Sequence, residues 1–143
     1  MEVRIGIIRR CEHQYVGECL EKYGLQPMEG QILYLLRDCC CSKQEDLCGR
    51  IDLDKGRIAR TLAHLEEIGL VKRSVSSRSR REKLVELTEE GEKMLDVIYG
   101  IYKDWENICY QGFSQEERKI YMEYLMRIAD NIKNYKRGGN VNG

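Results

Sequence analysis

Several residue types are scarce in this sequence, and each shortage excludes a class of protein. The 143 residues include one proline, one phenylalanine, one tryptophan and two histidines. No run of about eighteen apolar residues occurs, so no membrane-spanning helix is expected. The first residues, MEVRIGIIRRCEHQ, hold only a broken apolar stretch that ends in two arginines, unlike a secretory signal. We therefore expect a cytoplasmic protein, and the scarcity of proline favours a mostly helical one.

Clusters of residues that carry chemistry are also missing. The seven cysteines are odd in number and three are consecutive, at positions 39–41, which fits a disulfide framework poorly. The two histidines, His13 and His64, lie in separate segments, and no C-x-x-C pair occurs, so no metal site is expected. There is neither a glycine-rich phosphate loop nor a nucleophile at a recognisable spacing from a base. We predict reduced thiols, no cofactor and no enzymatic activity.

The charges balance over the whole chain but not along it. Lysine and arginine together number 24, as do aspartate and glutamate, so the formal net charge is zero. Between residues 55 and 83, however, nine basic residues stand against three acidic ones, an excess of six positive charges. A concentrated basic segment in a neutral protein is typical of a surface that binds a polyanion.

The basic segment begins with a pattern that predicts an amphipathic helix over residues 54–69. Apolar side chains recur at four- and three-residue steps and form one stripe for burial: Ile58, Leu62, Leu65 and Ile68. Asp54 is placed to cap the first turn, and Gly69 to end the helix in a left-handed conformation. Cationic groups share another face: Arg57, Arg60 and His64. A helix with these two faces suits insertion into a DNA major groove.

Three further helices are expected before this one. A first helix covers residues 1–23, and Pro27 begins a second, strongly apolar helix. The segment Ser42-Lys43-Gln44-Glu45 matches a capping box and predicts the start of a third helix. Asp52 and Leu53 then form a tight turn before the cationic helix. Two short helices joined by a tight turn are the helix-turn-helix pattern.

After Gly69 the apolar period changes from 3.6 to 2, which predicts a β-hairpin. Its strands are expected at 70–75 and 83–87, and the tip at 76–82 contains no apolar residue. Thr88 is placed to cap a helix of about twenty residues with a wide apolar face, and a last helix begins near Gln115. These two helices leave apolar area uncovered, which favours pairing with a second subunit over an intramolecular core.

The segment from Ser42 to Gly91 resembles the winged helix-turn-helix of MarR-family transcriptional regulators. Four pieces carry the resemblance by their order and spacing: Ser42-Lys43-Gln44-Glu45-Asp46-Leu47, Ile51-Asp52-Leu53-Asp54-Lys55-Gly56, Leu62-x-x-Leu65-Glu66-Glu67-x-Gly69-Leu70-Val71 and Arg80-Arg81-x-Lys83-Leu84-x-x-Leu87-Thr88-x-x-Gly91. The resemblance implies a mainly α (α+β) fold and one MarR-like domain over 1–143. Residues 27–91 would form the DNA-binding lobe with a two-stranded β-wing, and 1–23 with 89–137 the helical dimerisation region.

The resemblance also implies a homodimer that binds double-stranded DNA. Each subunit would place its recognition helix in a major groove and its wing tip over an adjacent minor groove. Two-fold symmetry predicts a palindromic operator with half-sites about 34 Å apart. The residues expected to contact DNA lie in the third helix, the recognition helix and the wing: Ser42, Lys43, Gln44, Lys55, Gly56, Arg57, Arg60, Thr61, His64, Arg78, Ser79, Arg80 and Arg81. One position departs from the family, because Ser79 stands where an acidic residue usually steadies a wing arginine, so a looser wing is expected.

The function predicted on this basis is a repressor that a small-molecule effector releases from DNA. The effector would bind between the DNA-binding lobe and the dimerisation helices and shift the spacing of the two recognition helices. Four aromatic side chains are candidates to line its pocket, although they suit a core equally well: Tyr15, Tyr34, Tyr102 and Trp105.

Two other interpretations stay open. One is a redox-sensing regulator of the same fold, in which Cys11 reacts because the two preceding arginines favour its thiolate. Cys19 is a second candidate, and burial as a small apolar residue would explain either cysteine. The other is a winged-helix module that binds a protein partner and no DNA, which predicts binding without the salt dependence of phosphate contacts.

Overall fold

The computed structural model describes residues 3–37, 42–51 and 54–139. The cysteine triplet at 39–41 and the expected turn at Asp52 and Leu53 lie outside these residues. The chain divides into two compact units, Met1–Trp105 and Glu106–Gly143, and each is described by itself. The boundary falls inside the long helix that was expected to belong to the dimerisation region.

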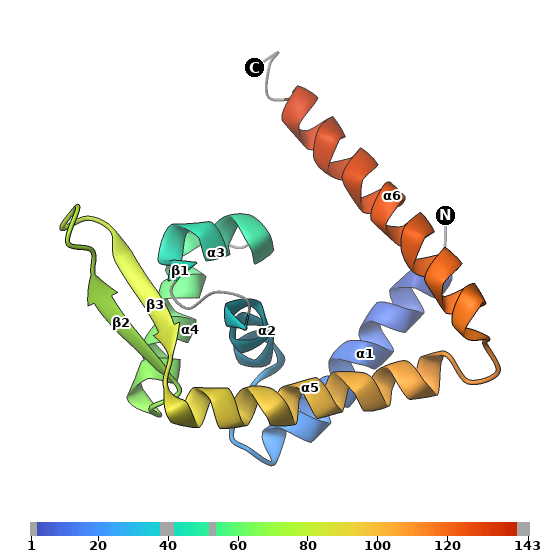
Figure 1. The fold of residues 1–143 in the computed structure, drawn as a ribbon, viewed down its shortest axis with the longest axis horizontal. Helices are drawn as coiled ribbons and strands as arrows, with labels where there is room; N and C mark the ends of the chain where they lie inside the picture. Colours follow the sequence, from blue (N-terminus) through green and yellow to red (C-terminus); the bar gives the residue numbers. More distant parts are fainter. Residues whose placement is uncertain (1–2, 38–41, 52–53, 140–143) are drawn as a thin grey trace. The chain divides into compact units, whose positions relative to one another are not determined.

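Helices predominate, as the sequence predicts, and Figure 1 shows their order. The elements are α1 (Val3–Glu21), α2 (Pro27–Leu36), β1 (Ser42–Lys43), α3 (Gln44–Ile51), α4 (Lys55–Glu67), β2 (Val71–Val75), β3 (Lys83–Leu87), α5 (Glu89–Cys109) and α6 (Gln115–Gly139). The predicted winged helix-turn-helix layout is therefore confirmed, with α4 as the recognition helix and β2–β3 as the wing.

The sheet has one more strand than the two expected. Its order is β1-β3-β2, all antiparallel, with Ser42 and Arg73 on either side of Val85. The short strand β1 comes directly before α3, so Ser42 pairs in the sheet and α3 begins at Gln44. A helix that began with Ser42 as its cap would start at Lys43, one residue earlier. The pairing joins the wing to the beginning of the helix-turn-helix.

The core of the first unit is built from leucine, isoleucine and valine on helices α1 to α5 and on strands β2 and β3. The side chains with at most 2% of their surface exposed are Val16, Leu20, Ile32, Leu33, Leu36, Leu47, Ile58, Leu62, Leu65, Val71, Val85 and Ile98. Three of the four stripe residues predicted in α4 are among them. The fourth, Ile68, is 43% exposed because the helix ends before it, at Glu67.

The two ends of α4 are formed as the sequence predicts. Asp54 Oδ1 accepts the backbone N–H of Arg57 at 2.8 Å, which satisfies a donor that the first turn leaves free. Gly69 has φ of +80°, the left-handed conformation that ends a helix. Glu66 then joins α4 to β2, because its carboxylate accepts the backbone N–H of Arg73 at 2.9 Å and the guanidinium at 3.1 Å.

A compact joint connects the wing to α5. The Thr88 hydroxyl donates to Gly69 O at 2.6 Å and its oxygen accepts the N–H of Gly91 at 3.0 Å, so Thr88 caps α5 as predicted. Gly91 lies against the backbone of the preceding turn. A Cβ there would be 2.0 Å from the carbonyl oxygen of Leu70, which no side chain can tolerate without a backbone shift.

The second unit consists of the end of α5, a turn and α6. Gly112, with φ of +85°, forms the turn, and Ser114 accepts the N–H of Glu117 at 3.1 Å to cap α6. Tyr110 packs edge-on to Phe113 and Tyr121, and the Arg118 guanidinium stacks over its ring. Among the described residues, no helix combines the length and the apolar character needed to cross a membrane.

Replacing Gly91 by alanine tests the joint. We expect the free energy of unfolding to fall by about 1–3 kcal/mol, because the added methyl group overpacks against Leu70. Gly100→Ala in the same helix is the matched control, since a Cβ there meets nothing within 4 Å and alanine favours helix by up to about 1 kcal/mol. Urea unfolding of both variants measures the difference, and equal stabilities would contradict the described packing.

The contact between Glu66 and Arg73 predicts a pH-dependent stability. The hydrogen bond from the Arg73 side chain, and then that from its backbone, lowers the pKa of Glu66 below the usual 4.5. A lowered pKa adds stability above 4.5 that is lost as the pH falls through the lowered value. Glu66→Gln should therefore be less stable than the wild type at pH 7, and the gap should be smaller at an acidic pH below 4.5. Urea titrations at both pH values measure this, with the exposed neighbour in Glu67→Gln as the control.

Candidate nucleic-acid interface

The first half of α4 presents cationic side chains to solvent. Lys55, Arg57 and Arg60 are all exposed, while Ile58 between them is fully buried and holds the helix in place. Lys55 Nζ lies 3.9 Å from Glu45 Oε1, but both side chains are about four-fifths exposed, so solvent screens the pair. Gly56 leaves the first turn without a side chain, between the Asp54 carboxylate and the Arg60 guanidinium. The Arg60 guanidinium is thus close to the carboxylate of the helix cap.

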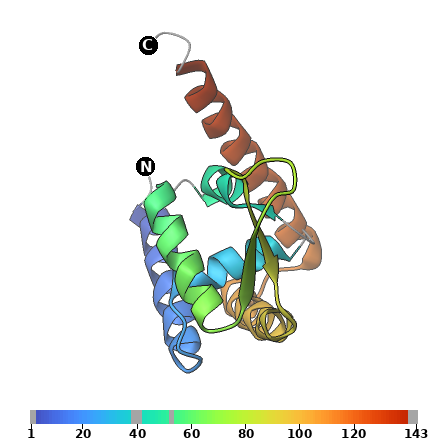
Figure 2. The ribbon, with the colours of Figure 1, turned by 90° about the vertical axis from the view of Figure 1, so that its left-hand side faces the viewer.

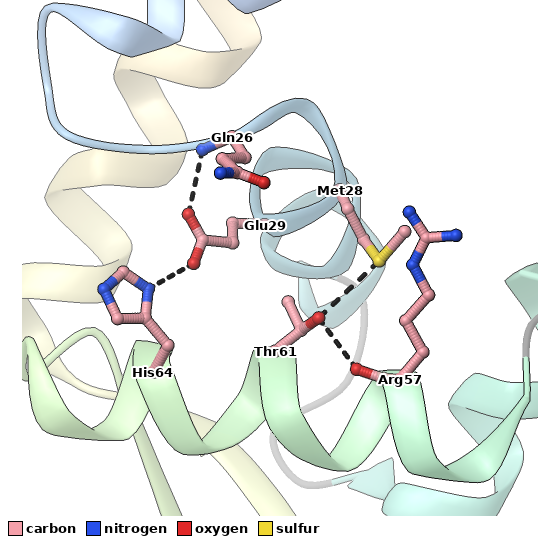
Figure 3. A network of polar contacts seen from close by, with 6 residues as sticks. All are labelled: Gln26, Met28, Glu29, Arg57, Thr61 and His64. Atoms are coloured by element: carbon pink, nitrogen blue, oxygen red, sulfur yellow. Dashed lines mark hydrogen bonds and ion pairs between the residues drawn. The ribbon is translucent and has the colours of Figure 1, made fainter.

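Thr61 and His64 point toward α2, as Figure 3 shows. The Thr61 hydroxyl lies 2.9 Å from Arg57 O and 3.6 Å from Met28 Sδ. The His64 ring contacts the carboxylate of Glu29 through Nδ1. These two residues were expected on the DNA-reading side of the helix, but both are engaged with α2, which leaves the Thr61 hydroxyl oxygen as an acceptor and the second ring nitrogen of His64 for another partner. DNA contact by Thr61 and His64 stays a prediction.

The beginning of α3 is connected to the wing by an ion pair. Lys43 Nζ lies 2.5 Å from Glu82 Oε1. The hydrogen bond with Glu82 raises the pKa of Lys43, and the same bond lowers the pKa of Glu82. Gln44, the first residue of α3, has a buried Oε1 that accepts no hydrogen bond from a described residue. The free backbone N–H groups of this first turn are suited to a phosphate.

The wing tip is ordered by hydrogen bonds within the hairpin. Ser76 N–H donates to Glu82 O at 2.9 Å, and Glu82 N–H to Ser79 O at 3.2 Å. The Ser79 hydroxyl accepts the N–H of Arg81 at 3.3 Å, and that of Ser76 accepts the N–H of Arg78 at 3.2 Å. Ser79 thus supports the turn through its backbone and hydroxyl, and Glu82 supplies a carboxylate on the other side of the arginine pair.

Intramolecular pairing leaves a specific set of cations unneutralised. Lys43, Lys72 and Arg73 each form an ion pair with a glutamate. By contrast, five arginines of α4 and the wing tip form no ion pair with any described residue: Arg57, Arg60, Arg78, Arg80 and Arg81. In the views of Figures 1 and 2, the wing tip, α3 and the beginning of α4 lie toward the same end of the first unit, away from α5.

A cavity of about 510 Å³ lies in the first unit, between α1, α2 and α5. Its lining is rich in basic side chains and consists of Gly6, Arg9, Arg10, Glu12, His13, Val16, Pro27, Gln31 and Tyr102. Of the four aromatic residues considered for an effector pocket, only Tyr102 lines it. Tyr15 packs on Trp105 and Tyr34 on Tyr102, with ring centroids 5.3 and 5.5 Å apart.

Both cysteines considered for redox sensing lie on α1. Cys11 is an exposed free thiol, and Cys19 is half-buried. The described residues contain no group of three or more histidine, cysteine, aspartate or glutamate side chains placed to hold a metal ion.

Sequence reasoning missed the acidic partners of this surface. Glu29, Glu66 and Glu82 were not singled out, yet each fixes one of the elements around the cationic end. A signal was available for Glu29, since it shares an i, i+3, i+4, i+7 face with Ile32, Leu33 and Leu36, all buried. A carboxylate on the buried face of a helix predicts a polar partner across the interface.

Comparison with known proteins agrees with this geometry. Residues 25–91 match a family model described as a winged helix DNA-binding domain. An HTH-type transcriptional regulator of Bacillus subtilis, YwoH, is 31% identical over 112 residues, which cover 78% of this chain and 80% of that protein.

Solved structures show the same fold over nearly the whole chain. A crystal structure of MarR has a TM-score of 0.85 and 28% sequence identity, and the match covers 95% of this chain and 94% of that one. A MarR-family regulator from Listeria monocytogenes, crystallised with a 26mer DNA, has a TM-score of 0.85 at 21% identity and shares the fold over 91% of this chain and 87% of its own. In sequence and in architecture, this chain belongs to the MarR family of winged-helix, DNA-binding transcriptional regulators.

Proposed function

We propose that this protein is a homodimeric repressor that binds a palindromic operator. The observation that carries the proposal is the set of five arginines on α4 and the wing tip that form no ion pair within the described part of the chain. Glutamates pair with Lys43, Lys72 and Arg73 nearby, whereas the five guanidinium groups keep their donors for an anionic partner such as DNA.

In the proposed complex, the first half of α4 enters the major groove. Arg60 and Arg57 carry the side-chain chemistry for guanine edges and phosphates, and Lys55 that for a phosphate. Gly56 allows the groove wall to approach the helix. The second half of α4 contains Glu66 and Glu67 and would be repelled by phosphates, so the helix must enter by its N-terminal end.

The wing and α3 complete the proposed contact. Arg78, Arg80 and Arg81 suit the negative potential of a narrow minor groove, and Ser79 shapes the turn that carries them. Ser42, Lys43 and Gln44 stand at the beginning of α3, where backbone N–H groups favour a phosphate. The Lys43 ammonium has three donors, so the Glu82 contact leaves capacity for a phosphate oxygen.

Dimerisation is supported by the apolar side chains that the single chain leaves exposed. On α6 they recur on one face, at 38–81% exposure: Ile120, Tyr121, Tyr124, Leu125, Ile128, Ile132 and Tyr135. On α1 four aliphatic side chains are exposed: Val3, Ile5, Ile7 and Ile8. Water contact with so many large apolar groups is unfavourable, and a second copy of the chain would cover them.

A small anionic effector is the second part of the proposal. The cavity between α1, α2 and α5 is lined by Arg9, Arg10 and His13. Among its described lining residues, Glu12 alone is acidic. A carboxylate or similar anion would be held there between the dimerisation helices and the DNA-binding elements. The redox alternative rests on the exposed thiol of Cys11, next to Arg10, and stays a hypothesis.

Replacing the free arginines of α4 tests the DNA contact. Arg57→Ala and Arg60→Ala should each weaken binding and lower the slope of log K against log salt by about 1, because one phosphate contact is lost. The probe is a duplex that the wild-type protein selects from a random-sequence pool, and fluorescence anisotropy measures binding at several salt concentrations. Lys93→Ala, which removes a cation from α5, should leave affinity and slope unchanged. If neither arginine variant changes the affinity for the duplex, or if wild-type binding does not depend on salt, α4 does not contact DNA as proposed. The alternative of a protein-binding module would then be favoured.

A charge on the apolar face of α6 tests dimerisation. Ile128→Glu should convert the protein to monomers and abolish tight operator binding, because a carboxylate would be buried against the second subunit. Lys119→Glu, which adds the same charge to the opposite face of α6, should leave the dimer intact. Sedimentation equilibrium measures the molecular mass, and a dimer that tolerates Ile128→Glu would refute the proposed interface.

A further inference from the structure

The carboxylate of Glu29 connects two helices and is almost fully buried. Its side chain is 8% exposed, and both of its oxygens are occupied. Oε2 accepts the backbone N–H of Gln26 at 2.8 Å, in the first turn of α2. Oε1 contacts Nδ1 of His64, 35 residues further along the chain, in the second half of α4 (Figure 3). Little solvent reaches this carboxylate, so water does not compete strongly for its two hydrogen bonds.

Glu29 is itself held rigidly by the helix that carries it. It lies on the same face as Ile32, Leu33 and Leu36, which are fully buried, so α2 cannot rotate to release it. Gly30, the next residue, lies against Leu20 of α1, where a Cβ would be 2.6 Å from Leu20 Cδ1. The position of the Glu29 carboxylate is therefore fixed within the first unit, and α4 faces it with His64.

The contact also defines His64. Because a carboxylate only accepts hydrogen bonds, Nδ1 must carry the proton, and the ring orientation is set. Nε2 lies on the far side of the ring from Glu29 in Figure 3, and the side chain is 46% exposed. One helical turn earlier, Thr61 meets Met28, so two neighbouring residues of α2 contact α4 along the same side.

A hydrogen bond of this kind to a buried carboxylate contributes direction more than stability. Replacing both partners by apolar residues is often neutral for folding, whereas the hydrogen-bond geometry fixes one arrangement. The apolar stripe of α4 buries it against the core, but apolar contacts tolerate small rotations and shifts. Arg57 and Arg60 reach DNA from the same helix, so such a rotation would displace their side chains from the groove.

We propose that Glu29 is a positioning residue for DNA binding, which acts through His64 to fix the rotation of α4 and touches no DNA itself. The inference rests on the proposed insertion of α4 into the major groove. It adds a residue from outside the helix-turn-helix to the determinants of operator affinity.

The test separates the position of α4 from the stability of the fold. His64→Leu removes the donor, and His64→Asn retains one, since the Asn amide nitrogen takes nearly the place of Nδ1. We expect the affinity for the selected duplex to fall about tenfold in His64→Leu and to stay within about threefold of wild type in His64→Asn. Equal losses in the two variants would overturn the inference.

A double variant keeps the test valid if the single one unfolds. Glu29→Met with His64→Leu removes both polar partners, so its free energy of unfolding should return close to the wild-type value. Its affinity for the duplex should nevertheless remain about tenfold lower. Wild-type affinity in the double variant would overturn the inference, because the pair would then serve stability alone. Arg60→Ala is measured beside it, and full binding by that variant would refute the proposed function instead.

Discussion

The buried stripe of α4 is the constraint on which the rest of the interface depends. Ile58, Leu62 and Leu65 are fully buried, and each contributes about 1.5–3 kcal/mol by leaving water. Once these three face the core, the helix has one side turned inward and the others turned outward or toward α2, and the contact of His64 with Glu29 then limits its rotation. Arg60 and Gly56 face outward, while Thr61 and His64 meet α2. Apolar packing thus decides which side of α4 is buried, and the polar contacts of Thr61 and His64 with α2 fix the orientation more closely.

Ion pairs within the chain then determine which cations of the surface remain without an acidic partner. The segment from 55 to 83 has six excess positive charges, but its glutamates are not spread evenly among the cations. Glu66 binds Arg73 at the joint between α4 and β2. Glu82, the last residue before β3, binds Lys43 of β1. These pairs fasten the elements that carry the free arginines. The same acids therefore order the scaffold and leave the positive potential at the wing tip and the beginning of α4.

Patterns within a few residues predicted most helices and strands, but they did not predict which distant residues contact each other. Asp54, Gly69 and Thr88 behave as the sequence predicts, because caps depend on neighbours within a few residues. The strand β1 was missed since two residues have no period, and Ile68 was assigned to the core because the stripe was extended past the helix end. The contact of His64 with Glu29 spans 35 residues, and spacing within one helix cannot reveal it. The DNA-contacting residues remain predictions.

The pairing of β1 with β3 has a consequence for the DNA that this protein can accept. Ser42 and Lys43 are bonded to the strand that returns from the wing tip, and α3 continues directly from them. The hairpin β2–β3 therefore does not move independently, because its movement would break the backbone hydrogen bonds between β3 and β1, which leads into α3. In the proposed complex, a subunit built this way would span a fixed length of duplex between the contact of α4 and that of the wing. We expect its half-sites to tolerate changes of base but no inserted or deleted base pair between those contacts.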